Sequence, residues 1–314
     1  MKKGFIFMIT VIVFLIIMLT VFYTYEVYKV SMDDNAVEKR VLSMNDYIKD
    51  LEVDVERAAY IAGFRTLLSI EEYVSETGEF MTNLETNFQE AFYSGNLSNT
   101  TPFMLENSTF SLYLQKINQN SKKIGVQVDI NISEINLLQT DPWNVQIDVV
   151  SKVTLNDTRG LADWSFEKTY TTNIPISNFK DPLYSVYLKG RLQNFIVKTD
   201  ITDFVDNNQT SALMSHIEDG LYKASNKAPS YLMRLRGNLS NSTYGVEGLI
   251  DINLLENQED LEVNYDRSVV DYIYFGNQST NNRCDVQNMP NWFKIDTEHI
   301  NDYEINELSY LNCT

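Results

Sequence analysis

The uncharged apolar run from Gly4 to Tyr25 constrains this chain most strongly. It is dominated by Ile, Phe, Val, Leu and Met, and as an α-helix it would extend roughly 30 Å, the thickness of a bilayer core. Lys2 and Lys3 precede the run and a mixture of charges follows it, so the positive-inside bias places the N-terminus in the cytoplasm. We therefore expect a cytoplasmic leader of residues 1–3, a single-pass anchor of residues 4–25 in the lipid bilayer of the cell membrane, and an extracellular C-terminal domain.

The residues after the apolar run indicate an anchor that is retained. A cleaved secretory signal has a shorter apolar core followed by small residues. This run ends instead in Phe22-Tyr23-Thr24-Tyr25-Glu26-Val27-Tyr28, whose aromatic rings suit the membrane interface.

Asn-x-Ser/Thr sequons are more frequent than this composition predicts by chance and favour a glycosylated outer domain. The alternative is that an Asn-rich chain carries idle sequons. The expected glycosylation sites are Asn96, Asn99, Asn107, Asn131, Asn156, Asn208, Asn238, Asn241 and Asn277; the sequon at Asn312 is discounted because it lies so close to the C-terminus.

The chain has two cysteines, Cys284 and Cys313. An even pair in an exported protein indicates one disulfide, which would fix the C-terminal tail to the preceding residues. The alternative is two buried free thiols.

A net charge of −18 keeps an exposed chain soluble and repels polyanions. Nucleic-acid binding is therefore excluded.

A heptad pattern follows the membrane run between Met32 and Ala62, where Gly and Pro are absent. Its apolar residues recur in steps of four and three and predict a long helix; they are Val37, Val41, Met44, Ile48, Leu51, Val55, Ala58 and Ala62. This heptad seam would pack on the protein's own outer domain, on a second helix, or on copies of itself or related surface subunits. We expect Gly63 to be the first hinge.

The pattern predicts an α+β fold, with a transmembrane helix continuing into a long helix and then an antiparallel β-rich head with short helices. Residues 26–95 form the expected helical stalk, and residues 96–180 a helix followed by a β meander of alternating strands near 124–133, 143–153 and 164–176. Residues 181–314 form a second β-rich half, with a short helix within 204–223 and strands at 231–236, 245–252 and 268–275. The aromatic residues after position 230 would fill the core or line a glycan-binding shelf.

Chemistry-bearing motifs are scarce, and we expect no catalytic residues and no cofactor. Nucleophile signatures, zinc-protease motifs and phosphate-binding glycine loops do not occur. We expect His216 to be a surface or packing residue and not part of a functional site. A weak metal candidate is the run Asp296, Glu298, His299 and Asp302, whose ligand atoms suit a cation, but in an acidic chain such a run is more often a solvated face.

Lys2-Lys3-Gly4-Phe5 followed by an apolar helix resembles a type IV prepilin leader. That resemblance implies cleavage between Gly4 and Phe5, a retained helix that packs in a filament, and a β-rich head facing outward. The sequence departs from the family at the fifth mature position, which is Ile9 where the family usually has Glu. Four segments resemble uncharacterised archaeal membrane-anchored surface proteins, a similarity that implies no activity: Ile174–Ile176, Asp181–Tyr184, Ala228–Arg234 and Ser268–Phe275.

The sequence therefore predicts a non-enzymatic, glycosylated cell-surface protein with a pilin-like architecture. The first alternative is an anchored extracellular domain that binds or senses a ligand. The second is an exported hydrolase that uses carboxylates.

Overall fold

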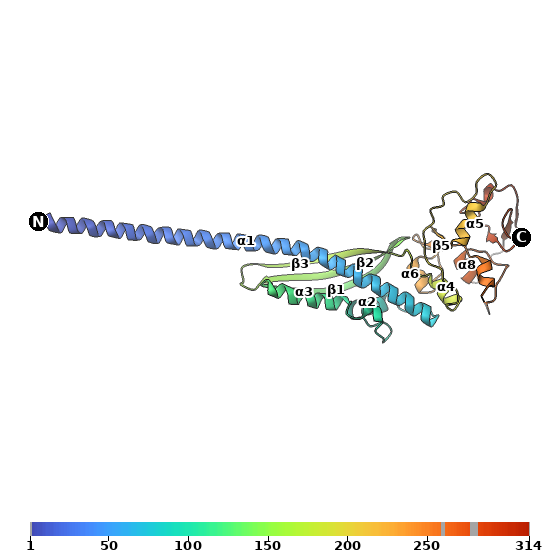
Figure 1. The fold of residues 1–314 in the computed structure, drawn as a ribbon, viewed down its shortest axis with the longest axis horizontal. Helices are drawn as coiled ribbons and strands as arrows, with labels where there is room; N and C mark the ends of the chain where they lie inside the picture. The colour runs from blue at the N-terminus through green and yellow to red at the C-terminus, as the bar shows by residue number, and fades with distance from the viewer. Residues whose placement is uncertain (1, 259–260, 277–281, 314) are drawn as a thin grey trace. The chain divides into compact units, whose positions relative to one another are not determined.

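The computed structural model describes residues 2–258, 261–276 and 282–313, and its fold is α+β (Figure 1). The helices are α1 (Lys2–Thr77), α2 (Leu84–Ser94), α3 (Phe110–Lys123), α4 (Pro182–Tyr187), α5 (Ser211–Glu218), α6 (Tyr231–Leu235), α7 (Ile252–Glu256) and α8 (Asp271–Gly276), with 3-10 turns η1 (Phe103–Leu105) and η2 (Ile305–Glu307). The strands are β1 (Val126–Asp141), β2 (Asn144–Asp157), β3 (Asp163–Pro175), β4 (Tyr222–Ala224), β5 (Val246–Gly248), β6 (Arg283–Val286), β7 (Lys294–Asp296) and β8 (Leu311–Cys313).

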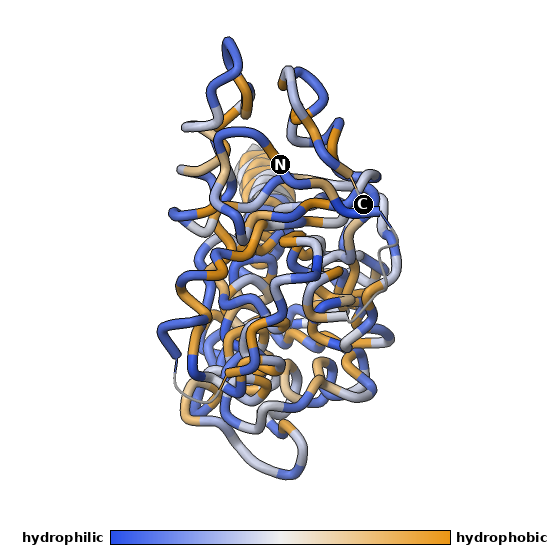
Figure 2. The backbone as a smooth tube through the Cα atoms, turned by 90° about the vertical axis from the view of Figure 1, so that its right-hand side faces the viewer, coloured by the Kyte–Doolittle hydropathy of each residue, from blue (hydrophilic) through white to orange (hydrophobic). Residues whose placement is uncertain are grey.

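Helix α1 confirms the predicted long helix. Its stretch Gly4–Lys29 is long and apolar enough to cross a membrane, and none of its side chains is buried within the protein. Figure 2 shows this hydrophobic character as orange turns of a helix seen close to the label of the N-terminus. Within residues 26–95, α1 continues to Thr77, and α2 begins at Leu84 after a break that includes Gly78.

The predicted hinge at Gly63 is wrong, because α1 runs through this residue without interruption. A Cβ atom at Gly63 would lie 2.2 Å from Cδ1 of Ile147 and 2.9 Å from Cδ1 of Ile174. Glycine is therefore used here for close packing of the helix on two strand residues, and not for flexibility.

The chain divides into two compact units. The first comprises Met1–Val55, Ile117–Ile130 and Val153–Phe166, and the second comprises Glu56–Lys116, Asn131–Lys152 and Glu167–Thr314. In the first unit Arg40 of α1 donates to Asp157 Oδ1 at 2.7–2.8 Å and to the carbonyl of Gly125 at 2.9 Å. This one side chain ties α1 to the ends of β2 and to the turn before β1.

The three long strands confirm the predicted β meander, and they pair in the order β1-β2-β3. Alternation of side chains is clearest in β2, where every second residue from Val145 to Asp157 is buried. Period-two alternation over this length is compatible only with a strand.

Residues 181–314 are not the β-rich half that the sequence predicted. Residues 231–236 and 268–275, both predicted as strands, instead contain the helices α6 and α8, and only part of 245–252 is the strand β5. The short helix predicted within 204–223 is α5, which ends at Glu218 before β4 begins at Tyr222. Every described residue of α8 except Gly276 is buried, and a short run buried on all sides carries no period that separates helix from strand.

The aromatic residues after position 230 mostly fill the core of this half, as the first of the two readings expected. Tyr231, Tyr303 and Phe293 are at most 1% exposed. Tyr274 and Phe275 are buried as well, and the Tyr184 ring packs edge-on against Phe275 with centroids 5.1 Å apart. Side chains in these positions cannot form an open shelf for a glycan.

Glu71, on the last part of α1, makes the stability of the fold sensitive to pH. Burial raises the pKa of Glu71 to about 7, and Lys180, whose Nζ lies 3.8 Å from Oε1, only partly opposes this. The folded protein therefore holds a proton that the unfolded chain releases above pH 4.5 or so. Stability should fall as pH rises from about 4.5 to 7, by about 1–3 kcal/mol from this residue alone.

The variant Glu71→Gln should lose this part of the pH dependence. We expect urea unfolding at pH 5 and pH 8 to show a smaller difference for the variant than for the wild type, and a higher stability of the variant at pH 8. Glu76→Gln is the matched control, because Glu76 is an exposed glutamate near the end of the same helix. An unchanged pH slope in Glu71→Gln would contradict the assignment.

Candidate functional site

In the second unit, three carboxylate side chains lie close to the ring of His299. Asp296 ends β7, His299 and Asp302 follow in the turns after it, and Glu247 is the central residue of β5. We call Glu247, Asp296, His299 and Asp302 the histidine cluster. The first three are buried, and the Asp302 side chain is 31% exposed.

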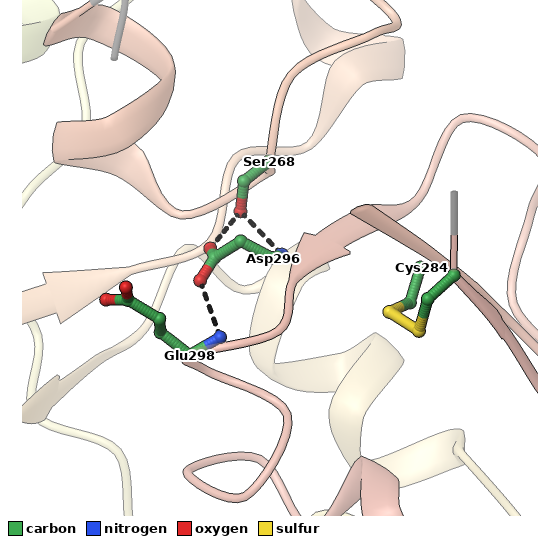
Figure 3. The surroundings of a disulfide bond; sticks show 5 residues. Ser268, Cys284, Asp296 and Glu298 are labelled. Atoms are coloured by element: carbon green, nitrogen blue, oxygen red, sulfur yellow. Dashed lines mark hydrogen bonds between the residues drawn. A yellow bond between two sulfur atoms is a disulfide. The ribbon is translucent and has the colours of Figure 1, made fainter. Parts of the chain in front are cut away.

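A chain of hydrogen bonds fixes the orientation of the His299 ring. Ser268 Oγ donates to Asp296 Oδ2 at 2.7 Å, and Asp296 Oδ1 lies 2.7 Å from His299 Nδ1. Figure 3 shows Ser268 and Asp296 in contact beside the Cys284–Cys313 disulfide. Because the carboxylate accepts from Nδ1–H, Nε2 faces the other side of the ring, where the Tyr272 hydroxyl lies at 2.9 Å.

These bonds and charges shift the pKa values of both partners. Burial alone would lower the pKa of His299, but the hydrogen bond to Asp296 and the negative charge of Glu247 raise it above its ordinary value. Burial alone would raise the pKa of Asp296, but the hydrogen bond from His299 and the charge of that ring lower it. Ser268 contacts the aspartate and not the imidazole, so the trio does not have the serine–histidine contact that activates a serine nucleophile.

Glu247 is the member of the cluster that sequence reasoning missed. Its side chain is fully buried, its Oε2 lies 3.6 Å from His299 Nε2, and neither carboxylate oxygen has a hydrogen-bond partner among the described residues. Burial, and then the charge of Glu247, raise the pKa of the nearby Tyr303 phenol. No local motif marks Glu247, because the pairing of β5 with β4 brings it to the cluster.

Two lysines lie on the outer side of the cluster. Lys227 Nζ donates to Asp302 Oδ2 at 2.7 Å and to the Glu298 carbonyl at 2.5 Å. Lys223 Nζ donates to the Asp302 carbonyl and lies 4.5 Å from the centre of the Tyr303 ring. Burial lowers the pKa of Lys223, although the charge of Glu247 opposes the shift.

The four sequence candidates for metal binding therefore have different positions. His299 and Asp302 share one group with Glu247, in which one ligand atom from each residue lies within 4.8 Å of the others. Asp296 is not in this group; its Oδ1 contacts His299 through Nδ1, the other ring nitrogen. Glu298 is exposed and joins the network through its backbone N–H, which donates to Asp296 Oδ1 at 3.1 Å (Figure 3).

A second buried network, which we call the arginine cluster, lies in the same unit. Arg234 Nη1 donates to Asp181 Oδ2 at 2.7 Å and to Asp271 Oδ2 at 2.8 Å, and all three side chains are fully buried. The Tyr222 hydroxyl also donates to Asp181, and the Gly248 N–H donates to Asp271. Burial raises the pKa of Asp271, whereas the charges of both carboxylates raise the pKa of Arg234 despite its burial.

His216, the other histidine, is a packing residue in the structure. It is fully buried on α5, with its ring 5.1 Å from Phe204 and 5.9 Å from Tyr303 between centroids. Burial lowers the pKa of His216 to about 4, so the ring is neutral at physiological pH.

The predicted disulfide forms between Cys284 and Cys313.

Six of the expected glycosylation residues are exposed: Asn99, Asn107, Asn131, Asn156, Asn238 and Asn241. Asn96 and Asn208 are partly buried, and Asn277 lies outside the described residues.

Comparison of the chain with protein-family models, with curated proteins and with solved structures finds no match.

Proposed function

We propose that this chain is a non-enzymatic surface protein, anchored in the membrane by the apolar part of α1 and glycosylated outside the cell, that assembles as a pilin-like subunit. The observation that carries the proposal is the exposure of Gly4–Lys29, whose apolar side chains find no cover within the protein. A soluble protein rarely leaves an apolar surface of this size in water.

The hydroxyl groups within this stretch also suit a lipid environment. Thr10, Thr20 and Thr24 each donate to a backbone carbonyl one turn earlier, at 2.8–3.0 Å. A hydroxyl that is satisfied within its own helix can enter lipid without an unpaired polar group.

The heptad seam supports assembly only over its first part. Met44, Leu51 and Val55 of the seam are buried within the protein. Val37 and Val41, which come before them, are 37% and 36% exposed. Self-association is therefore proposed through the apolar stretch of α1 together with Val37 and Val41.

Glycan positions follow from exposure and from the hydrogen bonds of each asparagine. Asn208 Nδ2 donates to Ser309 Oγ at 2.8 Å, and Asn208 Oδ1 accepts from the Ser309 N–H at 3.0 Å. Asn208 is partly buried, and a glycan on Nδ2 would replace one of its two hydrogens beside Ser309, so we propose occupancy at the six exposed sites and not at Asn208.

Intact mass spectrometry of the protein from its native membrane tests the proposal, with and without reduction and deglycosylation. We expect the loss of Met1–Gly4, glycans that map to the exposed asparagines, and a mass increase of two hydrogens on reduction. A Gly4→Leu variant should retain the leader, because the residue on the cleaved side is changed. An intact N-terminus in the wild type would overturn pilin-like processing, and release of the protein by alkaline washing of membranes would overturn the anchor.

A further inference from the structure

The feature of the histidine cluster that most requires a ligand is the Glu247 carboxylate. It is fully buried, and neither oxygen accepts a hydrogen bond from any described residue. The nearest cationic candidate, His299 Nε2, lies 3.6 Å from Oε2, beyond hydrogen-bond distance, and a buried carboxylate that accepts no hydrogen bond is costly. We propose that Glu247, His299 and Asp302 bind a divalent transition-metal cation of the zinc type.

The spacing of the ligand atoms fits such an ion. His299 Nε2 and Glu247 Oε2 lie 3.6 Å apart, close to the roughly 3.4 Å between two ligand atoms that are each about 2.1 Å from a tetrahedral ion. The third ligand atom, from Asp302, lies within 4.8 Å of both. The Asp302 side chain is 31% exposed, so it is free to close on the ion and forms the side from which the ion enters.

The hydrogen bond at His299 Nδ1 is of the kind that metal-binding histidines make. Metal-binding imidazoles usually donate their second N–H to a carboxylate, which fixes the tautomer and the direction of the ligating lone pair. Asp296 accepts from Nδ1 at 2.7 Å and is itself held by Ser268. Nε2 is then directed toward Glu247 and toward the Tyr272 hydroxyl, which lies 2.9 Å away and would turn aside when the ion binds.

The charges around the site also favour a divalent ion. Carboxylates outnumber ammonium groups by two when the imidazole is neutral: Glu247, Asp296, Asp302 and Glu304 face Lys223 and Lys227. A dication neutralises this excess. Lys227, which donates to Asp302 at 2.7 Å, competes with the ion for one carboxylate and releases it when the metal binds. A nitrogen ligand with two carboxylates suits a first-row ion such as Zn²⁺ better than Ca²⁺, which prefers oxygen ligands only.

Zinc titration of the full chain in detergent tests the site. After chelation, the wild type should take up one Zn²⁺ per chain in competition with a chromophoric chelator, and Co²⁺ in its place should give visible absorption bands of a low-symmetry site. We expect at least tenfold weaker binding for Glu247→Gln and for Asp302→Asn, and unchanged binding for the control Glu307→Gln, an exposed acid on η2.

Folding of the variants is checked by circular dichroism. Glu247→Gln keeps the size and shape of the buried side chain, so we expect it to fold, and Asp302→Asn supplies an independent test at a partly exposed position. The proposal is overturned if the wild type binds no stoichiometric zinc. It is equally overturned if both variants bind as tightly as the wild type, since the binding would then be adsorption to the acidic surface.

Discussion

Replacing Arg234 by methionine should lower the free energy of unfolding by about 3–5 kcal/mol, the range found when one partner of a buried ion pair is removed. Arg234, Asp181 and Asp271 are fully buried, so the variant leaves two carboxylates without their cation. The loss should be smaller at pH 5 than at pH 7, because protonation then removes part of the uncompensated charge. Urea unfolding of the full chain in detergent at the two pH values measures both effects.

Two control variants distinguish the loss of the buried cation from the effect of replacing an arginine side chain by a methionine. Arg236→Met changes the same residue type two positions away, where Arg236 pairs with Glu85 and both side chains are well exposed; it should cost less than about 1 kcal/mol. Adding Asp181→Asn and Asp271→Asn to Arg234→Met should restore most of the lost stability, because no buried charge is then left unpaired. Equal losses in Arg234→Met and Arg236→Met would contradict the role of the arginine cluster.

Removing the disulfide should cost about 3–4 kcal/mol, the loop-closure entropy of the unfolded chain for a loop of this length. Cys284 and Cys313 are 29 positions apart, and they face each other across the pairing of β6 with β8. We expect Cys313→Ser, which changes the exposed partner, to lose this stability under oxidising conditions in denaturant unfolding.

A reducing agent supplies the internal control for the disulfide. It should lower the stability of the wild type to that of Cys313→Ser and should leave the variant unchanged. If reduction changes neither protein, the C-terminal strand contributes nothing to global unfolding and the expectation fails.

The sequence by itself could predict the elements whose residue pattern repeats many times along the chain. The apolar N-terminal part of α1 is specified by more than twenty uncharged residues, and the β meander by alternation over a dozen or more positions, as in β2. The disulfide was predictable because the chain has only two cysteines. In the helix and in the meander many residues repeat one pattern, so these elements can be predicted without knowing any contact elsewhere in the chain.

The second half was decided by tertiary contacts. The five residues of α6 and the six of α8 are too few to show a period, and their β-branched and aromatic side chains suggest strands. They are helical where Arg234 of α6 and Asp271 of α8 meet beside Asp181, the N-cap of α4, and this arrangement pairs the three buried charges.

The histidine cluster follows the same rule. Local spacing pointed to His299 and Asp302 but also to Glu298, which faces solvent. The decisive residue, Glu247, comes from β5, far away in the chain, and nothing around it marks it. The sequence determined the apolar N-terminal stretch, the long helix and the meander because their residue patterns are local properties. Only the tertiary structure decided which buried charges meet, because a charge far from its partner in sequence can be recognised only once the fold has excluded water from both.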